Sequence, residues 1–226
     1  QPDTISQQLQ ECDVIIHTAA LVSNAMQDSD MWQVNVLATR NLIQAAKENK
    51  VRRFVQISSI VAYGNSAEGE LDETHPVHAD GGSYVLTKLA SEHVVLSEQA
   101  KDDIEVVIIR PGDAYGPGSR PWIIAPLDAI AKNQFMLPEK GQGFFRPIYI
   151  DDLVRGIAMA SRHPDAAGEI FNLSCEGYMF TKDYFTPHYQ WLGKKRPLVV
   201  STNLALKISA LASKLANLMC NLNEAS

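Results

Sequence analysis

Short apolar runs alternate with longer segments of helical periodicity, and this alternation constrains the fold more than any other feature. Buried strands are expected at 12–20, 53–59 and 104–110, because near-continuous apolar runs are typical of strands covered on both faces. Helices are expected between them, at 30–49 and 83–99. Strands separated by helices of about ten residues or more form parallel βαβ units with right-handed crossovers. The predicted fold is therefore α/β, with a doubly wound parallel sheet.

The second half of the chain has a different sequence pattern, with a predicted loop followed by short strands and helices. Residues 111–118 are rich in glycine and proline and predict a loop. After them we expect a helix, a short strand, a helix, a short strand and a helix, at 121–133, 144–150, 151–162, 169–174 and 181–192. Residues 1–118 are predicted to form the sheet domain. Residues 119–226 are predicted to form mainly a small C-terminal subdomain, with some elements returning to the sheet.

The end of the chain carries an amphipathic stripe. Apolar residues recur at alternating steps of four and three, at Leu204, Ile208, Leu211, Leu215 and Leu218. The favoured interpretation is a helix packed on the domain or across a dimer seam. Lys207 and Lys214 lie off the stripe, which leaves open a basic amphipathic helix on a membrane surface.

Charge and cysteine content narrow the classes of function. The net charge of −6 argues against a nucleic-acid partner, which normally requires a basic surface. No apolar run is long enough to span a bilayer. The three cysteines are scattered and form neither a metal-binding pair nor a disulfide framework. No metal site is expected, and a reducing cytoplasm is the simplest location.

Tyr84 and Lys88 are the strongest candidates for proton chemistry. Residues four apart share one face of a helix, and a neighbouring ammonium is expected to lower the pKa of the phenol. Such a tyrosine can exchange a proton with a hydroxyl or a carbonyl. Ser59 ends the strand expected at 53–59, at the sheet edge where open α/β folds bind ligands. Its hydroxyl can donate to developing negative charge, with Ser58 as a weaker second contact.

A second Tyr-x-x-x-Lys pair, Tyr178 and Lys182, shows how weak this spacing is alone. It follows a turn at 175–177, and no serine-ended strand lies at a suitable distance upstream. We interpret this second pair as structural.

Further motifs occur along residues 12–175 in a fixed order. They are His17-Thr18-Ala19-Ala20, Asn35, the Ser-Ser-x-x-x-Tyr-Gly stretch at 58–64, the Asp-Glu-x-x-Pro loop at 72–76, the Arg-Pro stretch at 110–118, Arg146 to Leu153, and Phe171-Asn172-Leu173. Together with Tyr84 and Lys88, they resemble extended short-chain dehydrogenases/reductases of the NAD-dependent epimerase/dehydratase family, in particular its 3β-hydroxysteroid dehydrogenase-like branch. The resemblance implies an NAD(P)-binding Rossmann fold and a substrate-binding subdomain.

The resemblance also implies roles by position. Catalysis is assigned to Ser59, Tyr84, Lys88 and Asn35, with Asn35 holding a water in the proton relay. The implied contacts to NAD or NADP are Thr18, Ala19, Ala20, Asn35, Ile57, Ser58, Tyr84, Lys88, Pro111 and Gly112. The implied substrate contacts are Ser59, Ile60, Val61, Asp113 and Arg146. In nucleotide-sugar enzymes of the family, the arginine matching Arg146 grips a diphosphate. Arg110 is expected to be a structural ion-pair partner, and His17 to bond to backbone at the strand end.

One part of the family pattern is missing. The family begins with a strand and a glycine-rich turn at a helix N-terminus, which hold the pyrophosphate, and no such run occurs here. The chain begins with Gln1, so we expect the first βα units, roughly sixty residues, to be absent. This fragment alone is expected to bind dinucleotide poorly and to be inactive. The residue that chooses between NAD and NADP would lie in the missing stretch.

Residues 60 and 61 bear on the reaction. Dehydratases of the family carry an Asp-Glu pair after the catalytic hydroxyl residue, whereas Ile60 and Val61 can neither donate nor accept a proton. The favoured function is therefore hydride transfer between the cofactor and a hydroxyl or ketone of a fairly apolar, steroid- or flavonoid-like small molecule. A nucleotide-sugar 4-epimerase is the alternative, which Arg146 favours. A non-catalytic dinucleotide sensor is a second alternative, disfavoured because Ser59, Tyr84 and Lys88 are all present. By analogy with the family, the intact protein is expected to be a homodimer.

Overall fold

The computed structural model describes residues 5, 8–22, 27–64, 69–101 and 103–208. The chain divides into two compact units. The first consists of Gln1–Gly112 with Ile148–Ser174, and the second of Asp113–Pro147 with Cys175–Ser226. The division therefore falls after Gly112, rather than after residue 118, and residues 148–174 return to the first unit.

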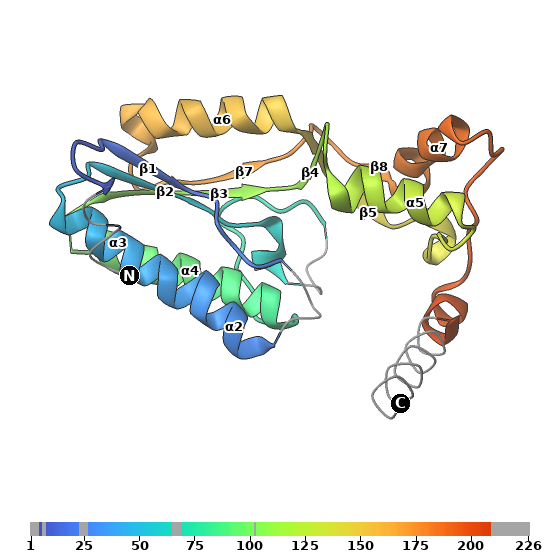
Figure 1. The fold of residues 1–226 in the computed structure, drawn as a ribbon, viewed down its shortest axis with the longest axis horizontal. Coiled ribbons are helices and arrows are strands. Elements are labelled where there is room, and N and C mark those ends of the chain that lie inside the picture. The colour runs from blue at the N-terminus through green and yellow to red at the C-terminus, as the bar shows by residue number, and fades with distance from the viewer. Residues whose placement is uncertain (1–4, 6–7, 23–26, 65–68, 102, 209–226) are drawn as a thin grey trace, which may run out of the picture. The chain divides into compact units, whose positions relative to one another are not determined.

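A parallel sheet of four strands forms the centre of the first unit (Figure 1). Its strand order is β1 (Val14–His17), β2 (Arg53–Ile57), β3 (Glu105–Pro111) and β7 (Ile170–Leu173). Val14 pairs with Arg53, Arg53 with Glu105, and Ile108 with Ile170. Helix α6 (Ile150–Arg162) covers one face, and α3 (Ala38–Glu48) and α4 (Ser83–Gln99) cover the other. The predicted doubly wound α/β fold is confirmed.

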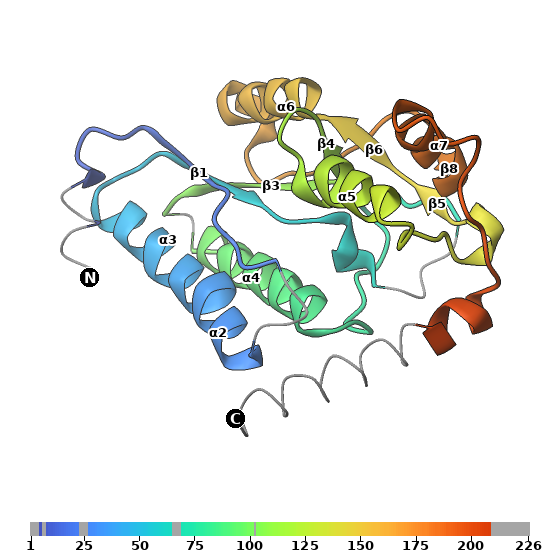
Figure 2. The same ribbon diagram turned by 45° about the vertical axis from the view of Figure 1, so that its right-hand side comes forward.

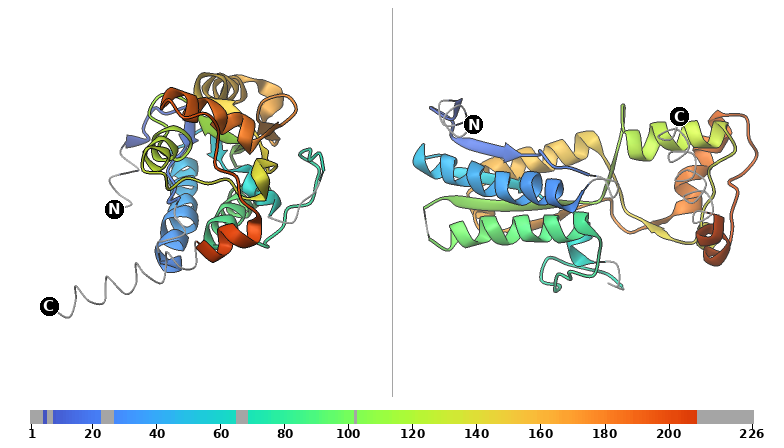
Figure 3. Two further views of the ribbon diagram at one scale, coloured as in Figure 1. Left: turned by 90° about the vertical axis from the view of Figure 1, so that its right-hand side faces the viewer. Right: turned by 60° about the horizontal axis from the view of Figure 1, so that its bottom comes forward.

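The core of this unit lies between the sheet and the helices α3 and α4, which run side by side (Figure 3). Its buried members are Ile43, Ala46, Val51, Phe54, Val95, Ile104, Val106 and Ile108. Burying a side chain such as Phe54 contributes about 1.5–3 kcal/mol. Because β2 and β3 are covered on both faces, both read as continuous apolar runs in the sequence.

The helix expected at 30–49 is interrupted. It is built from α2 (Asp28–Trp32), the π-helical turn η1 (Gln33–Leu37) and α3. Such single π-helical turns insert an extra residue and are frequent at functional sites. The strand expected at 12–20 is also shorter than predicted, because residues after His17 leave the sheet as a loop.

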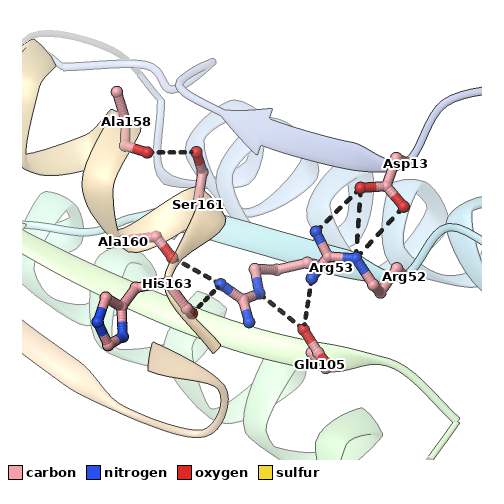
Figure 4. Close-up of polar contacts among 8 residues, drawn as sticks. All are labelled: Asp13, Arg52, Arg53, Glu105, Ala158, Ala160, Ser161 and His163. Carbon is pink, nitrogen blue, oxygen red and sulfur yellow. Dashed lines mark hydrogen bonds and ion pairs between the residues drawn. The ribbon is translucent and has the colours of Figure 1, made fainter. Parts of the chain in front are cut away.

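A cluster of ion pairs and hydrogen bonds lies at the amino-terminal edge of the sheet (Figure 4). Arg53 is buried, and its guanidinium donates to Glu105 Oε2 at 2.7 Å, to the Ala160 carbonyl at 2.8 Å and to the His163 carbonyl at 2.7 Å. The two carbonyls lie at the C-terminal end of α6, where the helix dipole favours a positive charge. The neighbouring Arg52 bridges Asp13 and Glu105, each at 2.9 Å. This cluster ties β1, β2, β3 and α6 together.

The second unit has an aromatic core. Its elements are β4 (Asp113–Tyr115), η3 (Arg120–Ile124), α5 (Ala125–Ala131), η4 (Glu139–Gly141), β5 (Phe144–Phe145), β8 (Met179–Phe180) and α7 (Thr181–Trp191). The helices α5 and α7 and the strands β5 and β8 are labelled in Figure 2. The strands β5 and β8 pair antiparallel, and Phe145, Tyr184 and Phe185 pack behind them with Leu137.

Two expectations for this region were wrong. The strand expected at 144–150 is divided at Arg146 into β5 and β6 (Pro147–Tyr149). The loop expected at 111–118 contains β4, because the Asp113 N–H donates to the Arg146 carbonyl at 2.8 Å, a pairing far away in sequence. Residues 202–208 are helical, but the rest of the expected amphipathic stripe lies outside the described residues.

Among the described residues, no helix combines the length and apolarity needed to cross a membrane. The described ranges also contain no group of three His, Cys, Asp or Glu side chains able to hold a metal ion.

Candidate active site

The carboxyl edge of β2 places Ser59 at the start of the 3₁₀ turn η2 (Ile60–Tyr63). Its Oγ accepts a hydrogen bond from the Val61 N–H at 3.3 Å and so caps the turn. Ile60 and Val61 are half-buried beside it. Gly64 ends the turn with a φ of 81°, and a Cβ there would lie 1.9 Å from Asp80 Oδ1. The turn after Ser59 therefore requires glycine.

Helix α4 brings Tyr84 and Lys88 to this edge and begins and ends at the predicted residues. The Lys88 side chain is buried, and its Nζ donates to the Ile57 carbonyl at 2.6 Å. An ammonium has three N–H donors, and Ile57 is its only hydrogen-bond partner within the described residues. Burial lowers the pKa of Lys88 to about 8, against the opposing effect of the Glu92 carboxylate. Two donors thus remain for a ligand.

The pKa of Tyr84 differs from the expectation. Burial raises the pKa of its phenol, and the hydrogen bond with Ser59 opposes this shift. We had expected Lys88 to lower this pKa. Lys88 instead directs its ammonium to the Ile57 carbonyl, and the buried surroundings of Tyr84 penalise the phenolate. In the protein alone, the surroundings of Tyr84 therefore favour the neutral phenol over the phenolate.

A buried hydrogen-bond network links α4 to β3 and to the residues after β2. Arg110 donates to Glu92 through Nε at 3.0 Å and Nη2 at 2.7 Å, and both side chains are almost fully buried. The expected structural ion pair of Arg110 is thus confirmed. The Ser58 hydroxyl also donates to Glu92, so its hydrogen is used within the protein. Arg110 further donates to the Tyr63 hydroxyl at 3.0 Å, and this hydroxyl contacts Asn172 Oδ1 at 2.9 Å.

Glu92 was missed by sequence reasoning, although a signal existed. Tyr84, Lys88 and Glu92 are spaced by four and four, which places all three on one helical face.

Asn35 lies buried in η1 and ties the loop after β1 to α4. Its Oδ1 accepts from the Leu21 N–H at 2.7 Å, and its Nδ2 donates to the Leu21 carbonyl and to Thr87 Oγ1, both at 3.0 Å. Both amide hydrogens are therefore used within the protein. The role of Asn35 in holding a relay water stays a prediction, and it would have to use the remaining lone pair of Oδ1.

Among the described residues, His17 bonds to a side chain and not to the backbone as expected. Its Nε2 lies 3.0 Å from Thr39 Oγ1, whose own hydrogen goes to the Asn35 carbonyl at 2.9 Å. Nε2 must therefore carry a hydrogen and donate it to Thr39. Burial, assisted by Lys88, lowers the pKa of His17 to about 4, so the ring is neutral at pH 7.

The remaining predicted cofactor contacts lie at the ends of neighbouring strands. Thr18 and Ala19 are exposed directly after β1, Ala20 is half-buried, and Ile57 ends β2. Pro111 ends β3, and the Gly112 N–H donates to the Leu173 carbonyl at 2.8 Å. These strand ends and the open donors of Lys88 fit the nicotinamide ribose end of a dinucleotide.

Asp113 and Arg146 belong to the second unit. The Arg146 N–H donates to Asp113 Oδ2 at 3.1 Å, and burial raises the pKa of Asp113 against this bond. The Arg146 guanidinium donates to the Gly177 carbonyl.

The family model of the NAD dependent epimerase/dehydratase family matches residues 1–174. The chain belongs to this family. Sterol-4-alpha-carboxylate 3-dehydrogenase, decarboxylating, from Candida albicans is 30% identical over 196 residues, which are 84% of this chain and 53% of that protein. UDP-glucose 4-epimerase from Vibrio cholerae is 32% identical over 178 residues, 74% of this chain and 53% of that enzyme.

Among solved structures of the epimerase/dehydratase family, UDP-glucuronic acid 4-epimerase from Bacillus cereus, in complex with NAD, superposes with a TM-score of 0.77. It is 25% identical, and the match covers 88% of this chain and 66% of that one. The chain spans about half the length of the curated relatives that it matches.

Proposed function

We propose that the protein containing this chain is an NAD(P)-dependent oxidoreductase of the extended short-chain dehydrogenase type. The observation that carries the proposal is the buried Lys88 ammonium, which has two open donors. Lys88 shares a helical face with Tyr84, whose phenol has a hydrogen bond with Ser59. Sequence relatives of both the dehydrogenase and the epimerase kind support it.

The residues divide the chemistry between them. The nicotinamide cofactor supplies or accepts the hydride when bound. Ser59 and Tyr84 donate hydrogen bonds to the substrate oxygen, and Tyr84 transfers its proton as negative charge develops there. Lys88 binds the ribose hydroxyls through its open donors, and the hydrogen bond with Ser59 favours the phenolate that Tyr84 leaves behind.

The favoured substrate is a fairly apolar small molecule with a hydroxyl or ketone, such as a steroid-like alcohol. Ile60 and Val61 follow Ser59 and offer no proton donor or acceptor, which disfavours dehydration. The sterol dehydrogenase relative supports this class of substrate. Nucleotide-sugar 4-epimerisation is the second candidate, supported by Arg146 and by the UDP-glucose 4-epimerase relative.

Further proposals concern the whole protein. The first unit would bind the dinucleotide and the second mainly the substrate. By analogy with the family, α3 and α4 would form the seam of a homodimer. The scattered cysteines support a cytoplasmic location.

The test is turnover by the full-length protein. NADH and NADPH oxidation is followed with a panel of apolar ketones, with Tyr84→Phe as the control variant. We expect turnover that falls by about 10²–10⁴-fold in Tyr84→Phe. Absence of turnover, together with NAD-dependent interconversion of nucleotide-sugars in a parallel sample, would replace the reductase by the epimerase. Activity that is unchanged in Tyr84→Phe would contradict both.

A further inference from the structure

The last described segment of the chain, residues 191–208, is here called the tail segment. It begins at the end of α7 and finishes in a helical turn at 202–208 (Figure 1). Its middle pairs with Leu137, whose N–H donates to the Leu198 carbonyl and whose carbonyl accepts from the Val200 N–H, both at 2.9 Å. The backbone of the tail segment is therefore held to the second unit.

Large apolar side chains of the tail segment are exposed. They are Trp191, Leu192, Leu198, Val199, Leu204, Leu206 and Ile208. Single exposed apolar residues are normal on a protein surface, but a group as dense as this one is typical of an interaction site. In the helical turn, Leu204 and Ile208 share one face and Leu206 lies on the opposite side. A protein surface could cover only one of these two sides.

The tail segment is also basic. It carries four cations and no Asp or Glu: Lys194, Lys195, Arg196 and Lys207. The run without Asp or Glu extends from 184 to 223, although the whole chain has 26 acidic residues and a net charge of −6. Lys195 and Arg196 are exposed, and neither forms an ion pair with a described residue. Apolar surface and positive charge thus occur together.

The charged groups beside the tail segment do not cancel this charge. The Lys140 N–H donates to the Val200 carbonyl at 3.0 Å, so Glu139 and Lys140 are its neighbours. These two side chains are exposed and contribute one charge of each sign. The surface formed by the tail segment and its neighbours remains positive.

We propose that the tail segment binds the surface of an anionic lipid bilayer, with its apolar side chains among the acyl chains and Lys195 and Arg196 at the headgroups. Such a bilayer supplies both the apolar phase and the counter-charge. In a symmetric dimer, by contrast, this surface would meet its own copy and bring like charges together. The tail segment contains none of the residues assigned to catalysis or to cofactor binding, so the proposal goes beyond the proposed function.

The test is co-sedimentation of the full-length protein with phosphatidylcholine vesicles, with and without phosphatidylserine. We expect binding that is at least about 10-fold tighter with phosphatidylserine and that weakens as the salt concentration rises. The double variant Lys195→Ala with Arg196→Ala is expected to lose at least about 10-fold in affinity for the anionic vesicles. Leu206→Ser, which removes a side chain that is 63% exposed, is expected to lose a similar factor.

The matched controls lie on α6 in the first unit. Arg155→Ala with Arg162→Ala makes the same change in net charge, and Met159→Ser removes an apolar side chain that is 65% exposed. Both controls are expected to bind as the unmodified protein does. Losses in the controls as large as those in the tail variants would overturn the proposal.

Two further results would overturn it. One is that the full-length protein binds neither kind of vesicle, or both equally. The other is a dimer, detected by light scattering without vesicles, that Leu206→Ser converts to a monomer, because the surface would then belong to a second copy. Vesicle binding requires neither cofactor nor substrate, so its failure leaves the proposed oxidoreductase standing, and an absence of turnover leaves the binding result standing.

Discussion

The two edges of the parallel sheet use buried cations in opposite ways. At the amino edge, Arg53 donates to three acceptors within the protein, and Arg52 bridges two carboxylates. At the carboxyl edge, the equally buried Lys88 meets a single carbonyl, and burial lowers its pKa to about 8. A cation with acceptors on several elements holds those elements together, whereas a cation with a single carbonyl partner can bind a ligand. At the amino edge of the sheet, the paired cation contributes to stability. At the carboxyl edge, the cation with one partner is available for ligand binding.

The largest effect on stability is expected behind the carboxyl edge, at the ion pair of Glu92 and Arg110. Glu92→Gln leaves a buried guanidinium without its carboxylate, and breaking such a pair costs about 3–5 kcal/mol. Urea unfolding measures the loss. The double variant Glu92→Leu with Arg110→Met removes both charges and is expected to recover most of it. A loss in the double variant equal to the sum of the losses in Glu92→Leu and Arg110→Met alone would show that the pair is not coupled.

At the amino edge, neighbouring arginines provide a matched comparison. Arg53→Met leaves the Ala160 and His163 carbonyls without their donor and is expected to cost about 2–4 kcal/mol. Arg52→Met removes a side chain that is 41% exposed and is expected to cost less than about 1 kcal/mol. Thermal and urea unfolding of both variants test the contrast. Similar losses would mean that burial does not distinguish the two positions.

The smallest of the three effects is a pH dependence at His17. Its pKa is about 4 in the folded protein and 6.5 ordinarily, so only the unfolded chain takes up a proton as pH falls from 6.5 towards 4. This group therefore lowers stability in that window, by roughly 2 kcal/mol at pH 4.5, and has no effect above it. His17→Gln keeps a donor for Thr39 and should flatten the loss between pH 7 and 4.5. A variant with the same loss as the unmodified protein would exclude His17 as the cause.

The sequence predicted the elements at the carboxyl edge of the sheet better than the contacts that these elements make. Helix α4 was placed at 83–99 because its start follows a glycine-rich loop, and its spacing brings Tyr84 and Lys88 together. Strands β2 and β3 were recognisable because burial on both faces makes them continuously apolar. The acceptor for Lys88 is a backbone carbonyl. Every residue has such a carbonyl, so the sequence could not predict which one accepts. The strand β4 depends on a pairing with Arg146, more than thirty residues away, and local propensity does not encode such pairings.

The π-helical turn η1 has a consequence for the length of its helix. An α-helix rotates by about 100° per residue, so one residue more or fewer before Asn35 would turn its amide away from Leu21 and Thr87. Insertions and deletions that surface helices tolerate would here detach the loop after β1 from α4. In a lineage of such proteins, this segment should accept substitutions far more readily than changes of length.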